Sequence, residues 1–140
     1  MESVEKNFIE ALTFESGSMQ GYSLDFVKRS IVPAYEGELP NILRLEYIIP
    51  TSKIGLQFSL AISTGALLNV RIYNSSGQSF SLDDYLTKHK KTAIIEKLFA
   101  DRRDLTKSLN QIIAIFNGDM KGIVTGKQWE EIPFDWMGYK

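Results

Sequence analysis

Several residue types that usually carry chemistry are scarce in this chain. Its 140 residues include no cysteine and a single histidine. Without cysteine there is no disulfide, no thiolate metal ligand and no thiol nucleophile. One histidine then leaves mainly carboxylates as metal ligands, which argues against a zinc centre. The sequence therefore predicts no metal site and no cofactor.

Long hydrophobic runs are also missing. No apolar stretch approaches the roughly 20 residues that a helix needs to span a bilayer. The first residues, Met1 to Glu5, are acidic where a secretory signal is basic, and no apolar region follows them. We therefore expect a cytoplasmic protein without a membrane partner.

The composition is nevertheless that of a folded protein. The chain contains eight Phe, six Tyr and two Trp, which supports a substantial core. A chain of this length is the size of one ordinary domain and buries roughly two-thirds of its unfolded surface. We expect residues 1–140 to form a single domain.

Apolar and polar residues alternate with period 2 along three consecutive stretches, and more weakly along a stretch before them. Such alternation indicates strands with one buried face. It predicts a four-stranded antiparallel sheet, with strands at Tyr22–Arg29, Ile42–Ile49, Ile54–Ile62 and Ala66–Tyr73. The side chains expected in the core include Phe58, Leu60, Leu68, Val70 and Ile72.

Helical periodicity marks both ends of the chain. Apolar residues recur at helical spacing over Glu2–Glu15 and again from Leu105 to Phe116, with Gly118 as a natural stop. The second stripe should cover Phe58 and Leu60. Gly122 to Lys140 is rich in aromatic residues and should form an extended tail.

The region between the sheet and the last helix suggests two further helical segments. Ser81 followed by two acids is typical of an N-cap, and this first helix should stop near His89. A second helix should begin near Thr92. The apolar residues that it should bury are Ile94, Ile95, Leu98 and Phe99. Asp101 to Asp104 either cap a third helix or form an exposed turn within one long helix.

Together these elements predict an α+β fold. An N-terminal helix precedes the four-stranded antiparallel sheet, and two to three C-terminal helices pack on one sheet face. The extended aromatic tail follows the last helix.

Catalytic motifs do not stand out. His89 lies among lysines, and no carboxylate or hydroxyl partner is apparent from the sequence, so an exposed histidine is expected. Gly122 to Gln128 differs from a phosphate-binding loop in its glycine spacing and in having Gln128 after the lysine. Helix capping accounts for Asp83 and Asp84, which leaves a two-carboxylate hydrolase as the least favoured reading. We expect a protein that is not an enzyme.

The tail combines aromatic and acidic residues, and it allows two interpretations. Tryptophan is enriched in binding hot spots, and neighbouring acids suit a basic partner. Alternatively, the two tryptophans clamp the tail onto the domain. On the first interpretation the partner-binding residues are Trp129, Glu130, Glu131, Asp135 and Trp136, extended by Glu36 and Glu38.

The chain as a whole resembles the small cytoplasmic immunity proteins encoded beside bacterial polymorphic or contact-dependent toxins. The likeness comprises the leading helix, the meander of strands, the helix start at Phe80 to Leu86, and the terminal motif from Trp129 to Trp136. These families share no catalytic signature, so no functional residue is carried over. The resemblance implies a non-enzymatic module that binds and neutralises one cognate toxin domain, for which we expect a basic surface.

A nucleic-acid-associated regulator is the alternative function. Residues 88–107 hold most of the basic side chains outside the sheet: Lys88, Lys90, Lys91, Lys97, Arg102, Arg103 and Lys107. Lysine and arginine at such density can neutralise phosphates. Acidic residues are interleaved with them, however, and solvated helix faces explain the run better. We therefore do not expect this protein to have a nucleic-acid partner.

Overall fold

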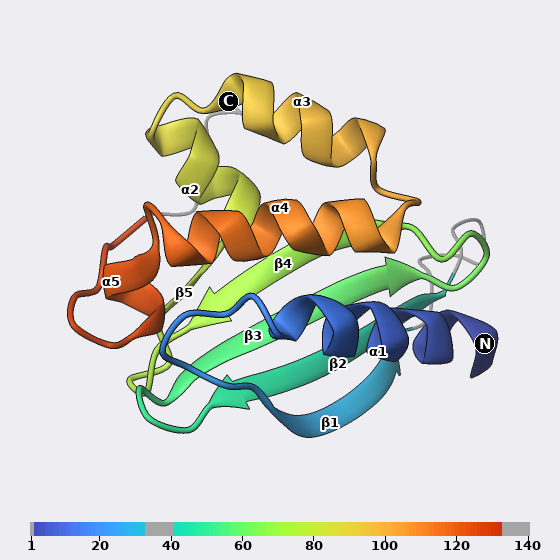
Figure 1. Ribbon diagram of the computed structural model, residues 1–140, viewed down its shortest axis with the longest axis horizontal. Helices are drawn as coiled ribbons and strands as arrows, with labels where there is room; N and C mark the ends of the chain where they lie inside the picture. Colours follow the sequence, from blue (N-terminus) through green and yellow to red (C-terminus); the bar gives the residue numbers. More distant parts are fainter. Residues whose placement is uncertain (1, 33–40, 133–140) are drawn as a thin grey trace.

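The computed structural model describes residues 2–32 and 41–132, in which one antiparallel sheet is followed by a group of helices (Figure 1). Along the chain the elements are α1 (Glu2–Ser16), β1 (Asp25–Val32), β2 (Ile42–Ile49), β3 (Ile54–Ala61), β4 (Leu67–Tyr73), β5 (Ser79–Ser81), α2 (Leu82–Lys88), α3 (Thr92–Ala100), α4 (Leu105–Asn117) and α5 (Lys121–Val124). The predicted α+β class is confirmed.

The sheet has five strands rather than the predicted four, in the order β1-β2-β3-β4-β5. The additional strand, β5, is only three residues long and pairs with the end of β4. Three residues are too few for an alternating pattern to be recognised. β1 also begins three residues later than predicted and runs on to Val32. Tyr22 and Leu24 alternate because they pack against the core, without pairing to another strand.

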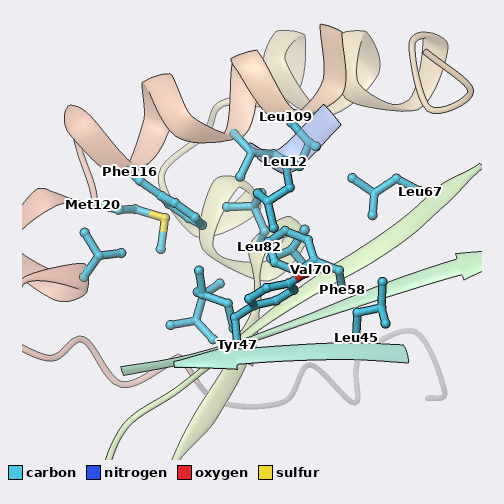
Figure 2. Close-up of a cluster of buried hydrophobic side chains, with 14 of the residues drawn as sticks. Leu12, Leu45, Tyr47, Phe58, Leu67, Val70, Leu82, Leu109, Phe116 and Met120 are labelled. Atoms are coloured by element: carbon cyan, nitrogen blue, oxygen red, sulfur yellow. The ribbon is translucent and has the colours of Figure 1, made fainter. Parts of the chain in front are cut away.

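The core lies between the sheet and the pair of helices α1 and α4. Phe58 and Leu60 are buried, and so are Leu109 and Phe116 of α4, as predicted. Helix α1 shares this cover, since the rings of Phe8 and Phe58 have centroids 5.0 Å apart. Figure 2 shows side chains of α1, α4 and the strands meeting in one cluster.

A β-bulge in β4 corrects the prediction that Leu68 is buried. Ser59 pairs with Asn69 while the next residue, Leu60, pairs with Leu67, so Leu68 has no partner on β3. The extra residue changes the alternation. Leu67 therefore enters the core, and Leu68 is 44% exposed. The N–H of Leu67 donates to the carbonyl of Arg102, 2.8 Å away, which ties the bulge to the start of α4.

Two side-chain caps separate the C-terminal helices. The Oγ of Ser81 accepts a hydrogen bond from the N–H of Asp84 at 3.1 Å, which confirms the predicted N-cap of α2. Asp104 caps α4 by accepting from the N–H of Lys107 at 3.1 Å. Because Asp104 begins a new helix, α3 and α4 are two helices rather than one.

Two expectations about the C-terminal region are wrong. α3 buries none of its residues, although four of them were expected in the core; Phe99 is 65% exposed. The tail also begins later than predicted, because α5 occupies Lys121–Val124 and buries Ile123 and Val124. The hydroxyl of Ser52 donates to the carbonyl of Val124 at 2.7 Å, which fastens α5 to the β2–β3 turn.

The two faces of the sheet differ in character. One face carries the buried apolar side chains and is covered by helices, which lie on the same side of the sheet (Figure 1). The opposite face carries Arg44 and Glu46 on β2, Gln57 on β3, and Asn69 and Arg71 on β4, all partly exposed. This second face, called the open face below, is polar and has no described helix over it.

Candidate binding surfaces

The segment that follows α5 lies against β5 and α2. The indole of Trp129 packs on the ring of Phe80 with centroids 5.0 Å apart and planes tilted by 43°. Trp129 is partly buried against the core. Such packing is what the clamp interpretation of the tail requires, because an aromatic ring contributes most when its faces leave water.

Glu130 is engaged by two side chains at the end of α2. Its carboxylate lies 2.9 Å from Nζ of Lys88 and 2.8 Å from Nε2 of His89. Burial raises the pKa of Glu130, but the hydrogen bonds and charges of Lys88 and His89 outweigh it, so its pKa is lowered. His89 directly follows α2 and is exposed, as predicted, but it has a carboxylate partner 41 residues away.

The other residues of the predicted tail site divide into two groups. Glu131 is exposed, and its Oε1 accepts a hydrogen bond from Nε2 of Gln78 at 2.9 Å. Asp135, Trp136, Glu36 and Glu38 lie outside the described residues. The structure thus brings Trp129, Glu130 and Glu131 together on α2 and β5, and their contact with a partner stays a prediction.

His89 has a carboxylate partner, but the described residues around it do not supply the nucleophile of a catalytic triad. Among the described residues, no serine or threonine hydroxyl hydrogen-bonds to its ring, which lies against the ring of Tyr85 at 4.4 Å. A triad needs a nucleophile within reach of the base. Within the same part of the chain, no group of three His, Asp or Glu side chains is placed to hold a metal ion.

Part of the basic run at 88–107 is occupied by contacts within the chain. Besides Lys88, Lys91 lies 3.7 Å from a carboxylate oxygen of Asp119. The guanidinium of Arg102 sits 4.0 Å above the Phe99 ring and also donates to the Phe99 carbonyl. These contacts reduce the basic charge that the helices present to solvent. A nucleic-acid role for the run stays a prediction.

An apolar cleft of about 420 Å³ lies between α3, α4 and the bulged start of β4. We call it the α3–β4 cleft. Its apolar lining includes Leu67, Leu68, Val70, Ile95, Leu98 and Phe99. The cleft exists because α3 stands away from the sheet, and because the bulge turns Leu68 outward. Leu68 and Phe99 are therefore the exposed apolar groups at its opening.

Acidic side chains accompany this cleft. Asp83 of α2 and Glu96 of α3 both line it and are exposed. Although the residue is exposed, partial loss of water around its carboxyl group, and after it the negative charge of Asp84, raises the pKa of Asp83. A positive group of a partner placed beside Asp83 would offset the repulsion from Asp84. The cleft thus combines two apolar anchors with two carboxylates and one cation, Arg102, which is stacked on Phe99.

A second cleft, of about 590 Å³, lies under α1 beside β1. Phe26 packs edge-on against Tyr47, with centroids 5.5 Å apart, and an ion pair between Glu5 and Arg29 lines the same cleft. The hydroxyl of Tyr22 is buried without a hydrogen-bond partner, and burial raises its pKa to about 12. Because the charges of Glu5 and Arg29 balance each other, this cleft favours neither an acidic nor a basic partner.

Comparison of the chain with protein-family models, curated proteins and solved structures finds no match. The function must therefore be argued from the chain itself. None of the described helices has both the length and the apolar character needed to cross a membrane.

Sequence reasoning missed the α3–β4 cleft for a specific reason. Leu68 and Phe99 both stand at positions that the periodic patterns assign to the core. A pattern shows which face of an element is apolar, but not whether another element covers that face. One signal in the sequence could have indicated the cleft. α3 adds four apolar residues next to a helix that already covers the sheet, so the helices carry more apolar side chains than the core needs.

Proposed function

We propose that the chain is a non-enzymatic protein-binding module that acts as an immunity protein and neutralises a basic toxin domain in the cytoplasm. The observation that carries the proposal is the α3–β4 cleft, where exposed Phe99 and Leu68 stand beside Asp83 and Glu96. A protein partner can contact both the apolar side chains and the carboxylates of this cleft.

The apolar part of the cleft supports a contact with another protein. Large apolar side chains contribute about 25 cal/mol for each Å² that leaves water, and binding hot spots are aromatic anchors seated in pockets. Phe99 is held at the opening by the Arg102 guanidinium above its ring. An anchor with a fixed position loses little side-chain entropy on binding.

The acidic part of the cleft supports a basic partner. Asp83 and Glu96 have no ion pair with another described residue. Carboxylates around an apolar centre attract a basic surface and discriminate against acidic ones. This is the combination of acids and aromatic anchors that the sequence led us to expect in the tail.

The test is protection of cells that express the toxin domain encoded beside this chain. The double variant Phe99→Ser with Leu68→Ser should fold normally but lose protection, and its affinity for the purified toxin should fall at least 100-fold. Phe14→Ser is the matched control, because Phe14 is an aromatic residue on α1 that is 76% exposed and lines neither cleft. If the double variant still protects fully, the toxin binds another surface.

The tail stays the second candidate surface. Glu131→Lys is the cleaner probe there, because the Glu131 side chain is exposed. Glu130→Lys would place a lysine beside Lys88 and loosen the tail, so lost protection would not distinguish binding from folding. If Glu131→Lys abolishes protection while the cleft variants still protect, the toxin binds the tail rather than the cleft.

A further inference from the structure

The open face of the sheet presents two arginines, Arg44 and Arg71, that have no carboxylate partner among the described residues. Arg44 on β2 has no ion pair with another described residue, and its Nε is buried without a hydrogen-bond partner. Nε of Arg71 on β4 donates to the hydroxyl of Ser79 at 3.0 Å, and within residues 2–32 and 41–132 no carboxylate pairs with Arg71. The described acids on this face are Glu46, which is paired with Lys28 at 3.5 Å, and Asp25, which lies at its edge opposite Ile48. The face therefore suits an anionic ligand.

A hollow of about 420 Å³ lies on the same face, over Gly55 near the start of β3. Gly55 pairs with Ile48 on one side and Tyr73 on the other, so these two side chains flank a position that has none. The charged residues that line the hollow are Lys53 and Glu46, of which Glu46 is paired with Lys28. A flat apolar group could lie between Ile48 and Tyr73.

Nothing in the backbone requires glycine at position 55. Its φ is not in the left-handed region, and a Cβ there would meet Tyr73 at 3.7 Å, which is ordinary van der Waals contact. A glycine inside a strand lowers stability and often marks the close approach of a ligand. The hollow is thus a feature that a side chain could fill without strain.

These groups follow one another along the strands. Tyr73 and Arg71 are two residues apart on β4, and Arg71 lies opposite Gln57, two residues from Ser59, which faces Arg44. The distance along the strands from Tyr73 to the level of Arg44 is roughly 13 Å, at about 3.3 Å for each residue. The ring of Tyr73 is thus followed along the sheet by the cations of Arg71 and Arg44. This order suits a polymer in which flat aromatic bases alternate with negative charges.

We propose that the open face binds single-stranded nucleic acid, with a base over Gly55 beside Tyr73 and phosphates at Arg71 and Arg44. Sheets that bind single strands stack bases on exposed aromatic rings, and basic side chains follow the backbone. This surface is separate from the basic run at 88–107, and the proposal does not depend on the toxin-binding function.

The test is fluorescence anisotropy with labelled ten-nucleotide oligo(U) and oligo(dT) in 20 mM salt. We expect binding that weakens with salt, with a slope of about −1.4 in a plot of log K against log salt for the two phosphates at Arg71 and Arg44. Gly55→Val should weaken binding about tenfold by filling the hollow, and Tyr73→Ser should do the same by removing the ring. Arg44→Gln with Arg71→Gln should make the slope shallower by about 1.4.

The matched control is Lys97→Gln with Arg103→Gln, which removes two charges from the helices and should leave binding unchanged. Each variant should keep its melting temperature within a few degrees; Tyr73→Ser supplies the answer if Gly55→Val does not fold. Three results would overturn the proposal. These are no binding at 50 μM protein, loss of binding in the helix variant alone, or equal binding of a poly-glutamate peptide that Gly55→Val leaves unchanged.

Discussion

Helices α3 and α4 are neighbours in the chain and have similar apolar patterns, yet they have different places in the fold. α4 buries five residues, whereas α3 buries none. Phe116 of α4 is 1% exposed and Phe99 of α3 is 65% exposed. The comparison teaches that amphipathicity creates an apolar face, while the fold decides whether that face becomes core or binding surface.

α4 is buried and α3 is not because the other helices already cover the apolar face of the sheet. α1 and α4 lie side by side and together cover the apolar face of the central strands (Figure 1). α2 covers the region near β4 and β5 with Leu82, Tyr85 and Leu86. α3 then packs only at the margin, where Ile95 and Leu98 are partly buried.

The largest effect expected from this comparison is that of Phe116→Ala. Removing a fully buried ring costs about 3–5 kcal/mol, from lost transfer energy and the cavity that remains. The free energy of unfolding from a urea titration should fall by that amount. A loss below about 1 kcal/mol would mean that α4 is as dispensable to the core as α3.

The caps of the two helices allow a second, smaller test. Asp104 caps α4, while Lys91 at the start of α3 makes no side-chain capping bond. Asp104→Ala should reduce stability by about 1 kcal/mol. Lys91→Ala removes no capping bond, and calorimetry should show a change of no more than about 0.5 kcal/mol.

The contact of the tail with α2 should depend on pH. Because the pKa of Glu130 is lowered in the folded protein, its contribution is complete above the ordinary glutamate pKa and disappears as pH falls through the folded value. We expect roughly 0.5–1 kcal/mol, since the carboxylate is partly exposed. Urea titrations from pH 7 to pH 3 should show this loss in the wild type and not in Glu130→Gln.

The smallest expected effect is that of Phe99→Ala. Because the ring is mostly in water, the free energy of unfolding should change by no more than about 0.5 kcal/mol. The change in the free energy of unfolding can be compared directly with that of Phe116→Ala, because both variants replace Phe by Ala on adjacent helices. A cost of 3 kcal/mol at Phe99 would show that α3 belongs to the core and that its cleft is not a free surface.

Local chemistry made much of the fold predictable. The alternation in β2 and β3 placed Phe58 and Leu60 in the core, and Ser81 and its acids located the start of α2. What escaped prediction depends on partners distant in the chain. The bulge at Leu68 is visible only in the pairing of β4 with β3, and the contact between His89 and Glu130 spans 41 residues. Within the tail site, the partners of Trp129, Glu130 and Glu131 inside the chain were not foreseen.

The strand order has a consequence for how the chain folds. Every strand pairs with the strand next to it in sequence, so the sheet can grow by closing one short loop after another. The slow step should be the meeting of α1 and the turn after it with α4, where Asn110 donates to Glu15 across 95 residues and Asn117 donates to the carbonyl of Ser18 across 99. Local contacts speed folding and distant ones delay it. The hairpins should therefore form first, and the core should close when the first helix docks.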